Sequence, residues 1–414
     1  MSINRGYRVK VYATLPVLNE TDNLPSVIDA ILNQEYSDIH LVVCVNQPDE
    51  WHAVPDKSHI CRNNLEALQY LYSLDDRRIT IIDKSTPGNG WIGRKHGVGW
   101  ARKTAMDAAN ELAQPEDIIL SIDADTWYTP EYFSAVVKAF DENQQAAGLS
   151  VPYYHPLTGD EITDRCVLRY EIYMRNYALN MLLINNPYSI SAIGSGMACT
   201  AAMYRKVRGI TPKMSGEDFY FIQKLKKAGN IIIDCDEVIY PASRFSDRVY
   251  FGTGPAMIKG RAGSWESYPV YDEELFKDVK LTFNLFCELY TGDVPTPMDD
   301  FLLDAFQTDM SGLWRPLREN CRTAEQFFKA AMQKVDGLRI LQFLKIKEKE
   351  GTDTSEERLA RFLNKNFSPH DEMEDAINQL LLHGFDKIAI GSLNLIRDFM
   401  FVHERSLQKV YRVV

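Results

Sequence analysis

The sequence predicts an α/β fold, with a mostly parallel sheet covered by helices on both faces, followed by an α-helical domain. In the first half, short aliphatic stretches alternate with stretches of helical length, which is typical of strand–helix–strand units in a parallel sheet. Beyond about residue 260 the strand-like stretches stop, and apolar residues recur at helical spacing. We therefore expect a sheet domain over residues 1–260 and an α-helical domain over residues 261–414.

The first domain is expected to begin with four strands separated by helices. The strands are expected at 10–17, 39–46, 78–84 and 118–123, and the helices at 23–34, 63–74 and 99–113. Asp22 is a candidate N-cap of the first helix. After the fourth strand, Thr129 followed by Pro130 is expected to start another helix, with Thr129 as its N-cap.

The second domain shows helical periodicity and no strand pattern. Helices are expected at 272–290, 324–349, 356–367 and 371–385. Leu359, Phe362 and Leu363 illustrate the three-and-four spacing of an apolar helix face. Three roles stay open for this domain: completing an acceptor site, self-association as a homo-oligomer, or docking on a membrane surface or a partner.

Composition and charge exclude several classes of protein. The 414 residues are 45% hydrophobic and 25% charged, which is ordinary for a globular protein, and the net charge of -11 argues against a general nucleic-acid binder. The seven cysteines are scattered and form no CxxC pair, so reduced thiols are expected rather than a zinc site. The start lacks the apolar core of a signal peptide, and no apolar run reaches the roughly 18 residues of a membrane span. We expect a cytoplasmic protein without a transmembrane span.

Polar side chains follow the expected strands at the points where the strands end. In a sheet of this kind, ligands bind beyond the carboxyl ends of the strands. The residues at or near those ends are Pro16, Asn19, Glu20, Asn46, Asp83, Asp123 and Asp125. This edge of the sheet is therefore predicted to form a crevice able to hold a nucleotide.

Asp123 and Asp125 end the fourth strand, directly after an apolar run. Burying carboxylates there is costly unless something compensates their charge. A turn would let both converge on a hard divalent cation such as Mg²⁺ or Mn²⁺, which takes oxygen ligands. The alternative is that the two aspartates only cap a turn.

The stretch 213–234 offers a second candidate carboxylate, Asp218. Ser215, three residues before it, fits a capping box, and Gly229 suits the helix C-cap. Asp218 therefore has a structural explanation as a capping carboxylate. The functional alternative is a general base at a helix N-terminus, which takes a proton from an acceptor hydroxyl.

Glycines and arginines give weaker signals. Gly194 and Gly196 permit a close approach of the backbone, although a plain tight turn explains them equally well. Arg244 and Arg248 could meet a diphosphate, because guanidinium groups match phosphate oxygens, or could be solvated surface residues. Arg102, in a locally basic stretch, is expected near the edge of the crevice.

Taken in order, four segments between residues 8 and 255 resemble the family 2 glycosyltransferases. They are "LPVLNETDNLPSVIDAILNQ", "KHGVGWARKTAMDAA", "SIDADT" and "GEDFYFIQKLKKAGN". They resemble, respectively, the family's opening P-x-x-N-E element, its A-R-N segment, its DxD motif and its E-D helix. The resemblance implies a GT-A fold, with a Rossmann-like mixed, mostly parallel sheet. It also implies transfer of a sugar from a nucleotide-sugar donor to a hydroxyl acceptor, with inversion at the anomeric carbon.

The resemblance also implies roles for single residues. It assigns the nucleotide-sugar to strand-end residues and arginines: Pro16, Asn19, Glu20, Asn46, Asp83, Arg102, Asp123 and Arg248. It assigns a divalent metal, Mn²⁺ or Mg²⁺, to Asp123 and Asp125. Asp218 is implied to be the catalytic base, with Glu217 and Gly196 on the acceptor side.

The sequence departs from the family pattern at three points. Asn46 stands where the family usually has an acidic residue, and Lys103 where it usually has asparagine. The Q-x-x-R-W motif of processive synthases is absent, which argues against polymer synthesis coupled to secretion. We expect a UDP-sugar first among donors, whereas the acceptor, a glycan, a lipid-linked sugar or a small molecule, stays open.

Other classes of protein compete with this interpretation. A sugar-phosphate nucleotidyltransferase would normally carry a glycine-rich basic loop after the first strand, where this sequence has "PVLNETDN". A Rossmann oxidoreductase is disfavoured because no GxGxxG follows that strand. A catalytically inactive nucleotide- or glycan-binding scaffold is distinguished from an enzyme by the pair Asp125 and Asp218, both of which are present. Trp127, Tyr153 and Tyr154 could stack on sugar faces or belong to the core.

Overall fold

The structure is a computed structural model that describes residues 8–246 and 252–414. The chain forms two compact units. The first, called here the sheet unit, comprises Met1–Val167, Ile190–Gly263 and Gln408–Val414. The second, the helical unit, comprises Leu168–Ser189 and Ser264–Leu407. The expected division into domains 1–260 and 261–414 stays a prediction.

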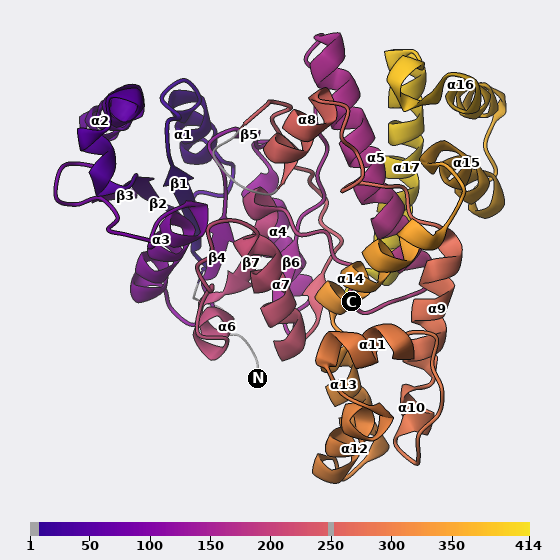
Figure 1. Cartoon of the computed structure of the whole chain (residues 1–414). Helices are drawn as coiled ribbons and strands as arrows, with labels where there is room; N and C mark the ends of the chain where they lie inside the picture. Colours follow the sequence, from indigo (N-terminus) through magenta and orange to yellow (C-terminus); the bar gives the residue numbers. More distant parts are fainter. Residues whose placement is uncertain (1–7, 247–251) are drawn as a thin grey trace. The chain divides into compact units, whose positions relative to one another are not determined.

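The sheet unit contains a seven-stranded sheet in the order β3-β2-β1-β4-β7-β6-β8 and, among the described residues, a separate ribbon of β5 and β9 (Figure 1). The strands are β1 Val11–Val17, β2 Ile39–Asn46, β3 Ile79–Lys84, β4 Ile118–Ser121, β5 Thr126–Trp127, β6 Gly148–Ser150, β7 Met197–Thr200, β8 Ile231–Ile232 and β9 Tyr240–Pro241. β1 to β4 are parallel to one another, and β7 runs antiparallel to both β4 and β6. The fold class predicted from the sequence is confirmed.

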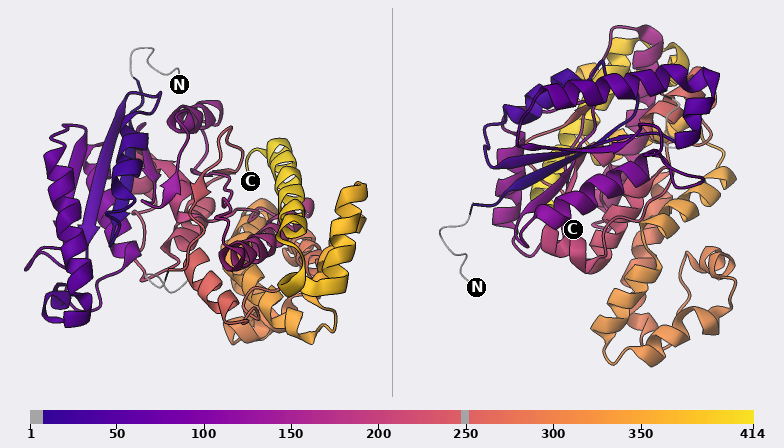
Figure 2. Two further views of the ribbon diagram at one scale, coloured as in Figure 1. Left: turned by 90° about the horizontal axis from the view of Figure 1, so that it is seen from above. Right: turned by 90° about the vertical axis from the view of Figure 1, so that its left-hand side faces the viewer.

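Helices pack on both sides of this sheet, as the right-hand view of Figure 2 shows for the strands of the first half. The helices that lie wholly within the sheet unit are α1 Leu24–Leu32, α2 Ser58–Ser73, α3 Val98–Leu112, α4 Tyr132–Glu142, α6 Ala201–Lys206, α7 Glu217–Ala228 and α8 Thr253–Arg261, and its short 3₁₀ turns are η1 Asp49–Ala53, η2 Pro55–Lys57 and η3 Gly194–Gly196. The apolar face of α1, formed by Leu24, Val27, Ile28 and Ile31, is buried. Burial of such a face, rather than helix propensity, supplies most of the stability of a short helix.

Three expected helix caps are wrong. The N-cap of α1 is Asn23 rather than Asp22. The helix after the fourth strand begins at Tyr132, two residues later than expected, because the hydroxyl of Thr129 donates to Glu237 Oε2 over 2.7 Å instead of capping it. The N-cap of α7 is a glycine, Gly216, whose positive φ of 75° turns the chain into the helix, so Ser215 does not form the expected capping box.

The helical unit consists of helices around two apolar clusters. Its elements are α9 Glu273–Asn284, α10 Phe286–Leu289, α11 Asp299–Phe306, α12 Met310–Asn320, α13 Ala324–Lys334, α14 Gly337–Lys347, η4 Glu348–Glu350, α15 Ser355–Asn366 and α16 Asp371–Lys387, with parts of α5 Glu161–Leu183 and α17 Ile390–Tyr411. The helix expected over 324–349 is two helices, because Asp336 caps α14 through the N–H of Arg339. Trp314, Phe286 and Phe327 centre one cluster.

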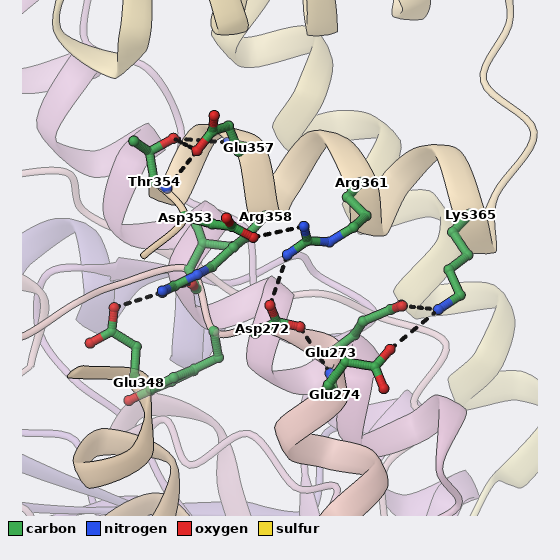
Figure 3. Close-up of polar contacts among 12 residues, drawn as sticks. Asp272, Glu273, Glu274, Glu348, Asp353, Thr354, Glu357, Arg358, Arg361 and Lys365 are labelled. Atoms are coloured by element: carbon green, nitrogen blue, oxygen red, sulfur yellow. Dashed lines mark hydrogen bonds and ion pairs between the residues drawn. The ribbon is translucent and has the colours of Figure 1, made fainter. Parts of the chain in front are cut away.

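Ion pairs join α9 and α15 on the surface of the helical unit (Figure 3). Arg361 contacts Asp272 and Asp353, each at 2.7 Å. Thr354 and Glu357 form a capping box that starts α15, and the side chain of Glu357 accepts from the N–H of Thr354 over 2.8 Å. Helices of this unit are therefore fixed by both caps and apolar packing. None of the described helices combines the length and the apolar character that a membrane crossing needs.

Candidate active site

The parallel strands β1 to β4 bring their carboxyl ends to one edge of the sheet. Glu20 follows β1 and Asn46 is the last residue of β2. Asp83 is the second-last residue of β3, and Asp123 follows β4. This is the edge at which α/β sheets bind ligands. The structure thus brings the strand-end residues singled out in the sequence to one side of the sheet unit.

Arg102 on α3 is the buried centre of a first cluster at this edge. Its Nε donates to Glu217 Oε1 over 3.0 Å, and its Nη2 donates to Asp123 Oδ1 over 3.0 Å. Its Nη1 donates to the carbonyl of Gly194 over 2.9 Å and to the hydroxyl of Ser121. Burial lowers the pKa of Arg102, but Asp123 and Glu217 outweigh it and raise the pKa above its ordinary value. Arg102 therefore stays charged and links α3, β4 and α7.

Asp123 is held from its backbone as well as from its side chain. Its N–H donates to the hydroxyl of Tyr128 over 3.0 Å, and that hydroxyl donates to the carbonyl of Ser195 over 3.1 Å. Burial and the neighbouring charge of Asp125 raise the pKa of Asp123, against the opposing effect of Arg102. Because 29% of the side chain stays exposed, a ligand at the sheet edge can still reach this carboxylate.

Asp218 is the second residue of α7 and lies beside the first cluster, partly exposed. Its Oδ1 accepts the N–H of Phe219 over 2.7 Å. Burial, followed by repulsion from Glu217, raises the pKa of Asp218 to about 7, although Arg102 opposes the shift. Glu217, in contrast, is 2% exposed and ion-paired with Arg102. Of the two adjacent carboxylates, Asp218 is the one placed to exchange a proton with a ligand.

The two glycines of η3 face different surroundings. A Cβ on Gly194 would lie 2.7 Å from Arg102 Nη2 and 3.4 Å from Asp218 Oδ2, so a side chain there would displace the cluster. A Cβ on Gly196 would lie 2.6 Å from a methyl group of Ile239. Gly194 therefore allows the backbone to approach the site, whereas Gly196 lies against the apolar interior, and its proposed acceptor role stays a prediction.

Arg244 is the centre of a second cluster, around Asp125 and Glu20. Its Nε donates to Asp125 Oδ2 over 2.9 Å, and its Nη2 donates to Glu20 Oε1 over 2.5 Å. The backbone brings it there, because the N–H of Ala242 donates to the carbonyl of Asp125 over 2.9 Å and continues the β5–β9 ladder. Arg248, the arginine assigned to the diphosphate from the sequence, lies outside the described residues.

Carboxylates outnumber arginines in the two clusters. The arginines are Arg102 and Arg244. The carboxylates are Glu20, Asp123, Asp125, Glu217 and Asp218. The described residues include no group of three or more acidic, histidine or cysteine side chains able to hold a metal by themselves. Mg²⁺ and Mn²⁺ commonly use one or two carboxylates and complete their shells with water and phosphate oxygens. The oxygens of Asp123 and Asp125 fit a cation that is shared with a diphosphate.

Asn46 at the end of β2 is buried and both ends of its amide are engaged. Its Nδ2 donates to the carbonyl of Val17 over 2.8 Å, and its Oδ1 accepts from Trp91 Nε1 over 3.1 Å. Its amide therefore holds the loop of Trp91 against the end of β1. A contact of Asn46 with the base of a nucleotide stays a prediction.

Asp83 organises the turn that follows β3. Its Oδ1 accepts the N–H groups of Ser85 and Thr86 over 2.8 and 3.0 Å, and its Oδ2 accepts from Asn89 over 3.2 Å. Burial raises the pKa of Asp83, but the hydrogen bonds led by Thr86 outweigh it, and the net shift is downward. Asp83 stays an ionised carboxylate at the sheet edge, and its assigned role at the base is a prediction.

The loop after β1 carries the other residues assigned to the nucleotide. Asn19 has a positive φ of 56°, and its N–H donates to Asn64 Oδ1 over 2.9 Å, which fixes the turn that presents Glu20. Pro16, within β1, is partly buried. Sequence reasoning found each of these residues, but it missed Ser121 as a partner of Arg102 and Glu20 as a partner of Arg244.

Several solved structures are similar to the chain over most of its length. The mannosyltransferase PcManGT from Pyrobaculum calidifontis, in complex with GDP-Man and Mn²⁺, is 15% identical, with 98% of this chain and 88% of that chain covered and a TM-score of 0.39. TarS 1-349 from S. aureus with UDP-GlcNAc is 12% identical, with 98% and 92% covered and a TM-score of 0.40. Glucosyl-3-phosphoglycerate synthase from Mycobacterium tuberculosis is 14% identical, with 62% and 81% covered and a TM-score of 0.34.

The family assignment rests on sequence. No protein of curated function matches the chain. The family model described as "Glycosyltransferase like family 2" matches residues 9–240, which is more than half of the 414 residues. The matched region contains β1, α3, the Asp123–Asp125 turn and α7, so it includes both clusters except Arg244. The chain therefore belongs to the glycosyltransferase family 2 proteins and is a glycosyltransferase with a GT-A fold.

Proposed function

We propose that this glycosyltransferase is metal-dependent and inverting, and that it moves a sugar from a nucleotide-sugar, with UDP-sugars as the first candidates, to a hydroxyl group of an acceptor. One observation carries the proposal. Arg102 and Glu217 join the Asp123 carboxylate at the end of β4 to the start of α7, where Asp218 is partly exposed and has a raised pKa. A charge-binding edge and a proton acceptor thus belong to one rigid cluster.

The donor side uses the strand ends. Asp123 and Asp125 would hold Mn²⁺ or Mg²⁺ together with diphosphate oxygens, and the cation would stabilise the charge that develops on the leaving diphosphate. Arg244 is the positively charged side chain nearest to Asp125 in the described structure and is 32% exposed. Its guanidinium can donate to phosphate oxygens in the geometry that it now uses for Glu20 and Asp125. Pro16, Asn19, Asn46 and Asp83 would line the nucleotide, and Arg102 would orient Asp123.

The acceptor side uses Asp218. In the proposed step, the acceptor oxygen forms a bond to the anomeric carbon while the bond from that carbon to the diphosphate breaks. The acceptor proton passes to Asp218, and the nucleoside diphosphate leaves with the bonding electrons. A single displacement of this kind inverts the anomeric carbon and needs the acceptor oxygen and the leaving group in line. A carboxylate whose pKa lies near 7 is a stronger base than an ordinary aspartate, and about half of it is ionised and able to take a proton at neutral pH.

The test is nucleotide release from a panel of UDP-, GDP- and dTDP-sugars, measured with Mn²⁺, with Mg²⁺ and with a chelator. Asp125→Ala and Asp218→Asn are compared with the native protein, and Asp56→Ala, at an exposed position on η2, is the matched control. The expected result is release from one class of donor, lost with the chelator and in Asp125→Ala, and retained in the control.

Other outcomes would point elsewhere. Nucleotide binding without turnover would favour an inactive scaffold. Consumption of a nucleoside triphosphate with a sugar phosphate would indicate a nucleotidyltransferase. Full activity with the chelator would remove the metal from the proposal. The stereochemistry is read from the anomeric proton of the product by NMR, and retention of configuration would contradict a single displacement.

A further inference from the structure

Trp127 is the exposed member of the six tryptophans, with 55% of its surface accessible, and it follows the Asp123–Asp125 turn directly on β5. We propose that Trp127, Tyr240 and Tyr154 form a stacking platform for a pyranose ring of the acceptor, which makes the acceptor a saccharide. This inference rests on the proposed function and names its acceptor class. The three residues are called here the aromatic platform.

The backbone fixes the aromatic platform. Trp127 pairs with Tyr240 in the antiparallel β5–β9 ribbon, and their rings lie 4.8 Å apart at an interplanar angle of 47°. The ring of Tyr154 lies 6.3 Å from that of Tyr240, edge to face, and the N–H of Tyr154 donates to the carbonyl of Ile239 over 2.9 Å. Rings held by adjacent backbone segments need little ordering when a ligand binds, which lowers the entropic cost of binding.

The platform is continuous with the proposed catalytic edge. Asp125 lies in the turn before β5, two residues before Trp127, so the two Cα atoms are at most about 7 Å apart, which is comparable to the size of one sugar ring. Thr126, between them, is buried, whereas Asp125 and Trp127 both reach solvent. Because Ala242 is bonded to Asp125 through its N–H, the same ribbon also leads to Arg244. A ring on the platform would therefore lie next to the donor.

The chemistry around the platform favours a sugar over an acyl chain or an apolar protein surface. Aromatic faces carry partial negative charge and attract the C–H groups on the flat face of a pyranose, while its hydroxyls project sideways and need polar partners. Polar groups are present at both ends of the ribbon: Asp125 and Arg244 on one side, and Glu237, which accepts from the hydroxyl of Thr129, on the other.

The experiment compares transfer with hydrolysis of the donor. Native protein, Trp127→Ala and Trp127→Phe are given the active donor with p-nitrophenyl pyranosides of the gluco, galacto, manno and N-acetylglucosamine series, or with the acyclic polyols glycerol and ribitol. Tyr72→Ala is the matched control, since Tyr72 is an exposed aromatic residue on α2. We expect Trp127→Ala to raise the KM for the pyranoside about tenfold and to lower the ratio of transfer to hydrolysis. Trp127→Phe keeps an aromatic ring and should recover most of the native KM and of the native ratio.

Each other outcome overturns the proposal. If Trp127→Ala raises the KM for pyranosides and for polyols equally, no sugar ring is stacked on Trp127. If the KM of Trp127→Ala equals that of the control Tyr72→Ala, Trp127 does not contact the acceptor. Binding is tested without turnover by saturation-transfer NMR with methyl pyranosides, so a failure of the proposed function does not hide the result. We expect contacts of the ring protons with the native protein that disappear in Trp127→Ala. Their absence from the native protein would contradict the platform.

Discussion

The sheet unit and the helical unit each contain a cluster of arginines and carboxylates, but the two clusters differ in charge balance and in exposure. In the helical unit, Arg175 on α5 contacts Glu171 at 2.5 Å and Glu404 on α17 at 2.6 Å, and Arg397 contacts Glu171 at 3.2 Å. No side chain in these pairs is more than 3% exposed. The two arginines and two glutamates match in number and join α5 to α17 within the unit, and Arg397 also contacts the partly exposed Asp398 at 2.8 Å.

In the sheet unit, the acidic groups are in excess, and Asp123, Asp125 and Asp218 reach solvent. Asp123 is 29% exposed and Asp125 is 23% exposed, while Arg102, Ser121 and Glu217 are buried behind them. Burial of an ion pair is therefore not what distinguishes the candidate active site. The distinguishing feature is an excess of carboxylates that solvent reaches, and the proposed binding of a cation and a proton would use this excess.

The largest effect is expected from Asp218→Asn, which removes the reachable base and keeps its shape. Loss of a general base typically costs about a hundredfold to ten-thousandfold in rate, so we expect a fall in kcat of that size with no loss of thermal stability. The rate of nucleotide release in the presence of a working acceptor measures it. Glu217→Gln is the comparison, because Glu217 is buried on Arg102 and its loss should lower both activity and stability. A normal kcat in Asp218→Asn would assign the base elsewhere.

In the helical unit, loss of an arginine is expected to lower the stability of the fold rather than the rate of the reaction. Arg175→Met removes the buried arginine that Glu171 and Glu404 share and leaves Glu171 with Arg397 alone, and breaking such a buried pair typically costs about 3–5 kcal/mol. Urea unfolding followed by circular dichroism measures the loss. Arg315→Met is the control, because its pair with Glu319 is exposed, and exposed pairs contribute little. If both variants unfold at the same urea concentration, the buried network of the helical unit does not stabilise the fold.

How far the sequence predicts these clusters depends on the distance between partners along the chain. The parallel strands and the aspartates at the end of β4 were predicted correctly, because an apolar run and its polar end are local signals. The bond from Arg102 to Gly194 spans 92 residues and that from Arg244 to Glu20 spans 224, and no local pattern indicates either. The sequence pattern does not distinguish Gly194 from Gly196; Gly194 is the glycine that lies against Arg102, and the acceptor role of Gly196 stays a prediction.

The helix α5 was missed for a related reason. It carries Glu171 and Arg175 in buried positions, so its charged residues do not mark a solvent-exposed face. A periodicity argument assumes that charged side chains lie outside, and a buried ion network breaks that assumption. The same reasoning explains why the sequence placed one boundary near residue 260, whereas residues of α5 belong to the helical unit.

Gly194→Ala tests how tightly the sheet-unit cluster is packed. The new Cβ would lie 2.7 Å from Arg102 Nη2, so the guanidinium must move away from the Gly194 carbonyl and from Asp123. Small displacements of catalytic groups are costly, and we expect kcat to fall about tenfold or more in a folded protein. Gly292→Ala is the matched control, because a Cβ there meets no atom within 4 Å. Equal activity in the two variants would indicate that the position of Arg102 is not critical.

The smallest effect is a pH dependence that the two units should not share. The pKa of Asp218 is raised from 3.8 to about 7, so between these values the folded protein keeps a proton that the unfolded chain releases. This contribution to stability is complete below about pH 4 and is lost as the pH rises through 7, because the Asp218 carboxylate then ionises in a buried position of the native state, which is unfavourable. The base, however, works only when ionised, so the rate should rise over the same interval in which stability falls.

Two measurements separate these trends. Urea midpoints between about pH 4 and 8 should decline more steeply for the native protein than for Asp218→Asn, whereas Arg315→Met should follow the native curve. The kcat/KM profile of the native protein should show an acidic limb near neutrality rather than near the ordinary pKa of an aspartate. Parallel midpoint curves for the native protein and Asp218→Asn would mean that Asp218 has an ordinary pKa. The candidate active site would then still differ from the buried network of the helical unit in charge balance and in exposure, but its proposed base would have the pKa of an ordinary aspartate.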